Sequence, residues 1–135
     1  MTKKQQKDFE KIVSEANIMA LPEIIVSRQA DLNYSNYLKE KIAETFNVNI
    51  KSNTRKQAVC EARQVFMYVM RKKTGFSLES IGRMVGRDHA TCLHSCNNVA
   101  SLLANDKKYR SQYASFIESQ GVELPMINRK EKVVL

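Results

Sequence analysis

The 135-residue sequence predicts an all-α fold, a compact helical bundle built around one domain. Apolar residues recur every three to four positions in successive stretches, which is the period of one face of an α-helix. Only four glycines and two prolines occur, too few turn-forming residues for a many-stranded sheet with tight hairpins. Hydrophobic residues make up 43% of the chain, which is enough to bury a core.

The chain is expected to divide into three parts. Residues 1–33 would form a helical appendage that packs on the domain or on another copy of it. Residues 34–120 would form the main domain. Residues 121–135 contain one proline, a charged run and no hydrophobic period, so we expect a flexible tail.

The appendage is predicted to contain two helices. Apolar residues between positions 4 and 20 have helical spacing. Pro22 would interrupt that helix and then occupy the first turn of a second one, which reaches about Ala30. Residues 31–33 would connect it to the main domain.

The main domain begins with a predicted helix over 34–46. Tyr34, Leu38 and Ile42 lie on one face of that helix. Turn-forming residues at 47–53 should end it.

A longer helix is predicted over 56–73, with basic residues in its last turn that complement the helix dipole. Gly75 is suited to ending it in the left-handed conformation. Its buried face should contain Val59, Ala62, Phe66, Val69 and Met70.

Three further helices complete the domain. Ser77 is a suitable N-cap for a short helix over 78–85, and Asp88 for a helix over 89–104. A last helix should cover 105–120. The expected inward-facing residues are Cys92, Cys96, Val99 and Leu103 in the second of these helices and Tyr109, Tyr113, Phe116 and Ile117 in the third.

The helices over 78–85 and 89–104 are separated by a very short turn, so they cannot lie antiparallel. They should cross steeply as a helix-turn-helix, which projects its second helix from the core. In DNA-binding versions, the N-terminal residues of the second helix reach base edges in the major groove. Here those residues are Arg87, Asp88, His89, Ala90 and Thr91, whose side chains can donate to guanine, accept from cytosine or contact the thymine methyl group.

The charge distribution supports nucleic acid as the partner. The net charge is +8, and residues 51–87 contribute nine cations against two acids, or +7 of that total. Such a surplus favours polyanions. The cations are not interleaved with aromatic residues, which favours the backbone of a duplex over stacking on single strands.

No stretch is apolar enough to span a bilayer, and the N-terminus lacks the apolar run of a signal peptide. Cys60, Cys92 and Cys96 are an odd number of cysteines in predicted helices, which fits a reducing compartment. We therefore expect a soluble cytoplasmic protein with no membrane partner.

The sequence contains little evidence for an enzyme. The four glycines lack the spacing of a phosphate-binding P-loop, so no ATPase module is expected. His89, Cys92 and Cys96 lie near one helix face, but structural zinc needs four ligands, and core packing of the cysteines is favoured. With two histidines and no paired carboxylates, we expect no enzyme, no metal and no cofactor.

The segment SLESIGRMVGRDHATCLHSCNNV at 77–99 resembles the signature of the C-terminal DNA-binding domain of the bacterial replication initiator DnaA. The segment ARQ at 62–64 and the following apolar helix resemble the arginine-containing loop and long helix of that family. The similarity covers about residues 34–118. It implies a helical bundle like those of TrpR and DnaA, and a stand-alone protein of this kind is not expected to melt an origin.

The resemblance implies roles for individual residues. Arg63 would reach the minor groove, although an exposed arginine on a first helical turn is the alternative. Base contacts would come from Arg63, Arg87, Asp88, His89, Ala90 and Thr91. Phosphate contacts would come from Arg55, Lys56, Lys72, Lys73, Arg83 and His94. His94 could equally be a plain surface residue, Lys72 and Lys73 could simply complement a helix terminus, and Arg87 could also hold a phosphate.

Three departures from the family pattern concern the target site. One glycine, Gly86, precedes Arg87 where the family usually has two, Ala90 replaces a threonine, and Glu61 occupies a position that is usually basic. We expect a sequence-preferring binder of double-stranded DNA, acting in replication initiation at an origin, in transcription or in a mobile element. The alternative is an adaptor for another replication protein, or a nonspecific nucleic-acid binder.

Overall fold

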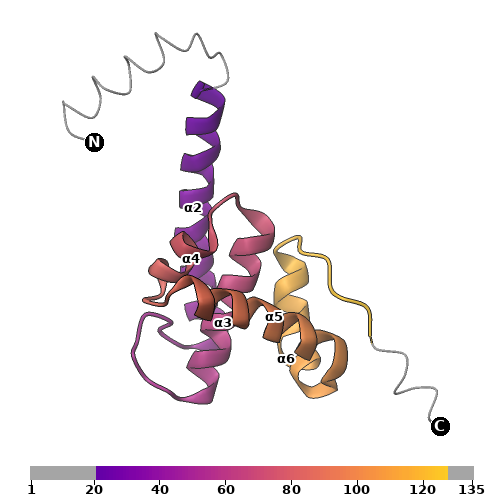
Figure 1. Ribbon diagram of the computed structural model, residues 1–135. Coiled ribbons are helices and arrows are strands. Elements are labelled where there is room, and N and C mark those ends of the chain that lie inside the picture. The colour runs from indigo at the N-terminus through magenta and orange to yellow at the C-terminus, as the bar shows by residue number, and fades with distance from the viewer. Residues whose placement is uncertain (1–20, 128–135) are drawn as a thin grey trace.

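The computed structural model describes the backbone of residues 21–127 and the side chains of residues 28–127. The described chain forms five α-helices and no strand, which confirms the all-α prediction. The helices are α2 (Leu21–Phe46), α3 (Gln57–Lys73), α4 (Leu78–Met84), α5 (His89–Asn105) and α6 (Lys107–Ser119) (Figure 1).

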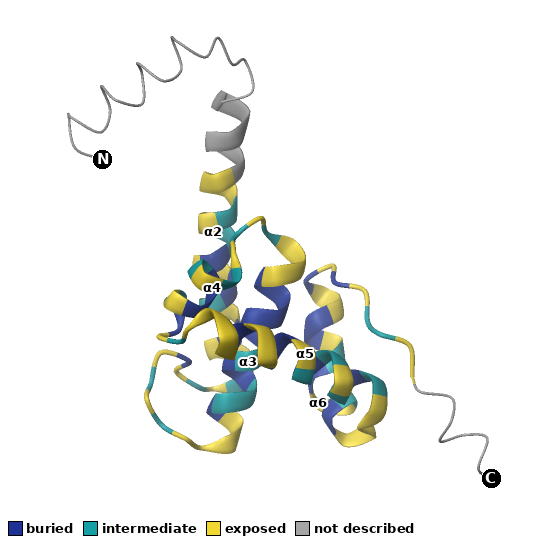
Figure 2. Ribbon diagram, viewed as in Figure 1, coloured by how far each residue is buried: buried dark blue, intermediate teal, exposed yellow. Residues whose placement is uncertain are grey.

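Helix α3 is the centre of the fold and contacts all four other described helices. Its predicted stripe of Val59, Ala62, Phe66, Val69 and Met70 is buried, with exposed fractions of 9% or less. Figure 2 shows the buried residues concentrated on α3 and on the helix faces turned toward it. Burial of this apolar surface is the main stabilising contribution to the domain.

Helix α2 is continuous, so the connector predicted at 31–33 is wrong. No glycine or proline occurs between Pro22 and Phe46 to interrupt it, and Pro22 lies in the first turn, where a missing N–H costs no hydrogen bond. The helix ends before Asn47, which has a left-handed φ of 53°. The N-terminal half of α2 stands clear of the other helices (Figure 1), and the helix predicted within 4–20 lies outside the described residues.

Side-chain caps define the starts of three helices, as predicted for Ser77 and Asp88. Ser77 Oγ accepts from the backbone N–H of Ser80 at 3.1 Å. Asp88 Oδ1 accepts from Thr91 N–H at 2.7 Å, and Asp106 Oδ1 accepts from Tyr109 N–H at 3.0 Å. Each cap satisfies a backbone donor that has no partner within its helix.

The prediction that Gly75 ends α3 in the left-handed conformation is wrong. Thr74 ends the helix instead, and both its N–H and its hydroxyl donate to the carbonyl of Met70, at 3.0 and 2.7 Å. The left-handed glycines of the described chain are Gly86 and Gly121, with φ of 69° and 78°.

Residues 121–127 pack on the helices, so the prediction of a flexible tail is wrong for this part. Val122 is buried, and Arg110 Nη1 donates to the carbonyls of Leu103 and Pro125 at 2.8 and 3.0 Å. Residues 128–135 lie outside the described part. No helix in the described part is both long and apolar enough to cross a membrane.

Candidate nucleic-acid interface

Helices α4 and α5 meet at a four-residue turn, residues 85–88. The N–H of Arg87 donates to the carbonyl of Gly82 at 2.7 Å, which folds the turn back onto α4. A Cβ at Gly82 would lie 2.6 Å from the carbonyl oxygen of Arg87 and 2.8 Å from that of Asp88. Glycine at this position therefore permits the close approach that sets the angle between α4 and α5.

Helix α5 has one buried and one exposed face. Cys92, Cys96, Val99 and Leu103 are buried, which confirms the predicted stripe. Burial raises the pKa of Cys92 to about 12 and also raises the pKa of Cys96. Neutral buried thiols act as small apolar groups, and the described residues contain no group of three side chains placed to hold a metal ion.

Five of the six predicted base-reading residues lie at the start of α5, and Arg63 lies elsewhere. Asp88, His89, Ala90 and Thr91 are exposed there, and Arg87 is half-buried with Nη1 donating to the Gly86 carbonyl at 3.1 Å. The hydrogen bond from the Thr91 N–H lowers the pKa of Asp88, so this carboxylate is charged at neutral pH. The first turn of α5 thus presents donors, an acceptor and methyl groups on one surface.

Sequence reasoning missed two residues on the same exposed face, Leu93 and Asn97. Leu93 is 38% exposed, which is unusual for a large apolar side chain on a polar helix face. Their spacing was a usable signal, because positions 90, 93, 94 and 97 follow the helical period opposite the buried stripe. An exposed apolar side chain beside base-reading groups can contact a thymine methyl group.

Arg63 is buried, which conflicts with the predicted minor-groove contact and with the alternative of an exposed arginine. Its side chain is 4% exposed and lies among the residues of α3 and the preceding loop. Nε donates to the carbonyl of Ile50 at 3.0 Å, and Nη2 donates to the carbonyl of Ser52. The physical reason is that the irregular loop leaves carbonyls without backbone partners, and a guanidinium can satisfy two of them at once.

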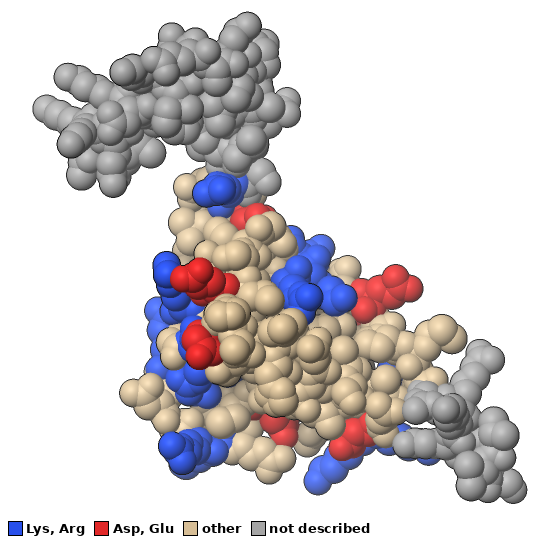
Figure 3. All heavy atoms as spheres, in the orientation of Figure 1, with Lys and Arg blue, Asp and Glu red and all other residues tan. Residues whose placement is uncertain are grey.

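The loop that Arg63 holds carries three exposed cations, Lys51, Arg55 and Lys56. Figure 3 shows Lys and Arg side chains gathered along the left edge of the molecule, where this loop and α4 lie. On α4, Arg83 is exposed and forms an ion pair with Glu79. Surface pairs of this kind contribute little to stability and leave Arg83 able to exchange partners.

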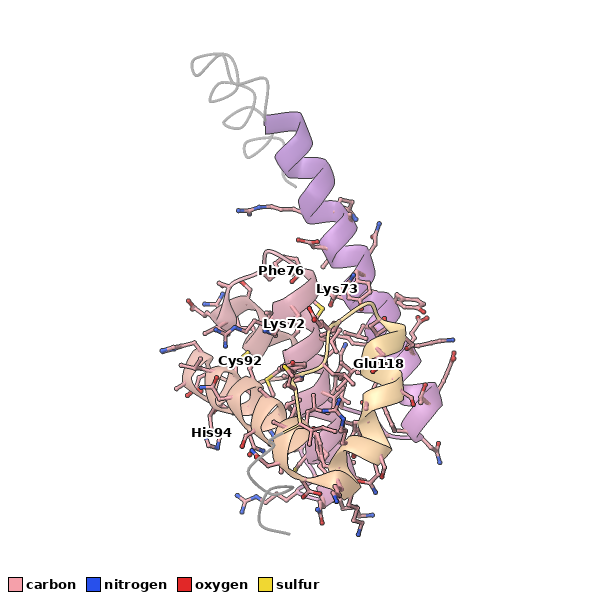
Figure 4. All side chains as sticks on the ribbon, turned by 90° about the vertical axis from the view of Figure 1, so that its right-hand side faces the viewer. Lys72, Lys73, Phe76, Cys92, His94 and Glu118 are labelled. Atoms are coloured by element: carbon pink, nitrogen blue, oxygen red, sulfur yellow. The ribbon has the colours of Figure 1, made fainter. Side chains whose placement is uncertain are left out.

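Lys72 and Lys73 lie at the C-terminal end of α3 (Figure 4). Lys72 Nζ is 5.7 Å from the centre of the Tyr68 ring. Both lysines line a hollow with residues 121–125 and Ala100, which is in the middle of α5. The structure places them beside the C-terminal segment, whereas His94 projects from the exposed face of α5 (Figure 4).

Glu61 is engaged within the protein. Gln57 Nε2 donates to its Oε1 at 2.8 Å, and the hydroxyl of Tyr113 donates to its Oε2. Burial, together with this bond to Glu61, raises the pKa of Tyr113. The carboxylate is thus oriented toward α6.

Residues 36–99 match the family model described as bacterial dnaA protein helix-turn-helix. The chain is 37% identical over 89 residues to the chromosomal replication initiator protein DnaA of Flavobacterium psychrophilum, covering 63% of this chain and 18% of that protein. It is 41% identical over 70 residues to DnaA of a Nostoc species, covering 49% of this chain and 15% of that protein. The chain thus spans less than a fifth of the length of these relatives. No solved structure matches it significantly.

Proposed function

Residues 36–99 belong to the bacterial DnaA helix-turn-helix family, and on this premise we propose that the chain binds double-stranded DNA with a sequence preference. The observation that carries the proposal is the exposed first turn of α5, which follows a short turn folded closely against Gly82 of α4. This arrangement lets the N-terminal end of a helix enter the major groove while the rest of the helix packs on the core.

Base reading is assigned to the first turn of α5 and the exposed face that follows it. His89 and Thr91 can donate or accept at base edges, and Asp88 can accept from cytosine. Ala90 and Leu93 supply methyl groups for thymine. Arg87, which is half-buried in the turn, is placed to donate to guanine or to the adjoining phosphate.

A second contact is assigned to the loop before α3, with Arg55 and Lys56 as the groups that meet DNA and Arg63 as the residue that positions the loop. The first turn of α3 lies beside Leu102 and Asp106, at the far end of α5 from His89. A helix of 17 residues is about 25 Å long. A duplex longer than this helix can therefore meet the first turn of α5 with its major groove and the loop with a neighbouring stretch of its backbone.

Phosphate contacts are assigned to Arg55, Lys56, Arg83 and His94, all of which are exposed. Such contacts set the register of the protein on the duplex but carry no sequence information. Lys72 and Lys73 lie beside residues 121–125. They would therefore contribute to DNA binding only by a general electrostatic attraction for the negatively charged duplex.

Binding to DnaA-type sites would let the protein act in replication initiation at an origin, or in transcription, in the cytoplasm where DNA is accessible. The support is that the curated relatives are chromosomal replication initiators. An adaptor role is the second candidate, because Leu32 and Tyr37 on α2 are 45% and 48% exposed. Exposed large apolar side chains are typical of surfaces that meet another protein.

The test compares His89→Ala with Lys56→Ala by fluorescence anisotropy at several salt concentrations. His89→Ala should weaken binding to the preferred duplex by about 1–3 kcal/mol and relax the preference. Lys56→Ala should weaken binding to every duplex equally and reduce the salt slope by about 1. Lys107→Ala, an exposed cation on α6, is the matched control and should change neither quantity. Identical effects of all three variants would exclude a reading surface at α5.

A further inference from the structure

A second surface feature lies away from the first turn of α5, in the groove between the start of α3 and the α5–α6 corner. The groove has a volume of about 490 Å³, within the range of ligand clefts. Its ionisable and polar lining includes Gln57, Glu61, Asp106, Lys108, Tyr109 and Tyr113. The proposed DNA contacts do not use it.

Two carboxylates give this groove its binding chemistry. Glu61 is fixed by the two hydrogen bonds from Gln57 and Tyr113. The carboxylate of Asp106 caps α6 through Oδ1 and accepts no second hydrogen bond within the described part of the chain. Lys108 is exposed at the rim, from which its flexible side chain can turn to solvent. The groove is therefore suited to a cationic side chain.

The described chain ends next to this groove. Ile127 lines a small hollow with Leu103, Asp106 and Arg110, and Asp106 also lines the groove. Residues 128–135 follow directly and carry Arg129, Lys130 and Lys132 against Glu131, or three cations minus one acid, +2. Eight extended residues reach about 26 Å, which is more than enough to enter the groove.

We propose that residues 128–135 dock in the groove, with a cation of the 129–132 run paired with Glu61 and Asp106. The docked segment would cover two carboxylates beside the start of α3, because Gln57 and Ala58 also line the groove. The effective concentration of a segment tethered so close is high, so weak ion pairs suffice to hold it. The docking does not depend on the proposed function, and its test contains no DNA.

Zero-length carbodiimide cross-linking of the full chain, followed by mass spectrometry, tests the proposal. We expect links from Lys130 or Lys132 to Glu61 or Asp106 within one chain. The double variant Glu61→Gln, Asp106→Asn should lose these links. The new amide oxygens can still accept from Gln57 and from the Tyr109 N–H, and the new amide NH2 at position 61 can donate to the Tyr113 oxygen. Glu118→Gln, an exposed acid of α6 outside the groove, is the matched control and should keep them.

A second measurement keeps the test independent of cross-linking yield. Substituting Glu for Arg129, Lys130 and Lys132 in the full chain should shift the amide NMR signals of Ala58, Glu61 and Gln112 and leave those of α4 in place. Links between an isotopically labelled and an unlabelled copy would overturn the proposal in favour of a second chain. Links from Lys3, Lys4 or Lys7 would overturn it in favour of the N-terminal segment, and unchanged groove signals would also contradict it.

Discussion

At the residue scale, Arg63 holds in place the loop to which we assign a DNA contact. Its guanidinium satisfies the carbonyls of Ile50 and Ser52 and so fixes a loop whose other side carries exposed cations. The sequence places Arg63 in the second turn of an apolar helix, and only the tertiary structure shows the direction of its side chain. A buried charge that is fully hydrogen-bonded is tolerated, whereas removing it leaves its carbonyl partners unsatisfied.

Replacing Arg63 with alanine should therefore destabilise the protein. We expect the free energy of unfolding to fall by about 2–4 kcal/mol in urea titrations followed by circular dichroism. Arg63→Lys should recover little, because one ammonium group cannot span both carbonyls. Arg55→Ala, the matched exposed cation, should change stability by less than about 0.5 kcal/mol while weakening DNA binding. An Arg63→Ala protein that is as stable as the wild type but fails to bind DNA would instead favour the minor-groove role.

Asp88 makes the stability of α5 depend on pH. The Thr91 N–H lowers the pKa of Asp88 below its ordinary value of 3.8. A group whose pKa is lowered by folding stabilises the folded state above its unfolded pKa, and this contribution disappears as pH falls through the folded pKa. Asp88→Ala should therefore destabilise the protein at pH 7 and differ less from the wild type in strong acid. Asp88→Asn, which keeps the cap acceptor, is the control, and a difference that stays constant with pH would contradict this account.

At the scale of elements, the angle between α4 and α5 depends on the closeness of the turn to Gly82. A methyl group there would meet two backbone oxygens at less than 3 Å, and backbone atoms in a hydrogen-bonded turn cannot easily move aside.

Gly82→Ala should consequently lower both stability and DNA affinity, by an amount within the usual 1–3 kcal/mol range of overpacking substitutions. Gly75→Ala provides the matched control, because the nearest atom to its Cβ would be Asp31 Oδ2 at an ordinary 3.8 Å. Thermal unfolding and anisotropy on the same samples measure both effects. Equal behaviour of the two variants would show that the turn tolerates a side chain at Gly82.

The sequence predicts those elements that depend on residue type and spacing within a short segment. The caps at Ser77 and Asp88 and the stripe of Cys92, Cys96 and Val99 were all identifiable from residue type and spacing. The continuity of α2 through 31–33 was missed, because weak amphipathicity there resembles a connector although no helix-breaking residue is present. The packing of 121–127 was missed for a different reason: it depends on long-range contacts such as Arg110 to Pro125, which leave no periodic signal.

Like the fold, the candidate site could be predicted from the sequence only in part. The first turn of α5 follows from the spacing of two helices and a capping residue. The sequence does not predict the inward orientation of Arg63 or the position of Lys72 and Lys73 beside residues 121–125, because both depend on how α3 packs against its neighbours. Charge alone locates a basic region but not the face on which each cation lies.

At the scale of the whole molecule, α3 links the two proposed DNA contacts. The loop before α3 carries Arg55 and Lys56, and α5 packs along α3 with its exposed first turn at the far end. A buried core between the two contacts keeps their spacing constant, so both can meet one duplex without rearrangement. The N-terminal half of α2 projects from the other described helices (Figure 1).

The central claim is that this chain prefers particular duplex sequences, and one competition experiment tests it directly. A labelled duplex carrying a DnaA-type site is bound at about 150 mM salt and challenged with scrambled duplex and with single strands, since affinity without a stated salt concentration is uninterpretable. The account predicts a preference of order 10³ for the site over scrambled duplex. Scrambled duplex or single strands that compete as well as unlabelled site duplex would contradict it.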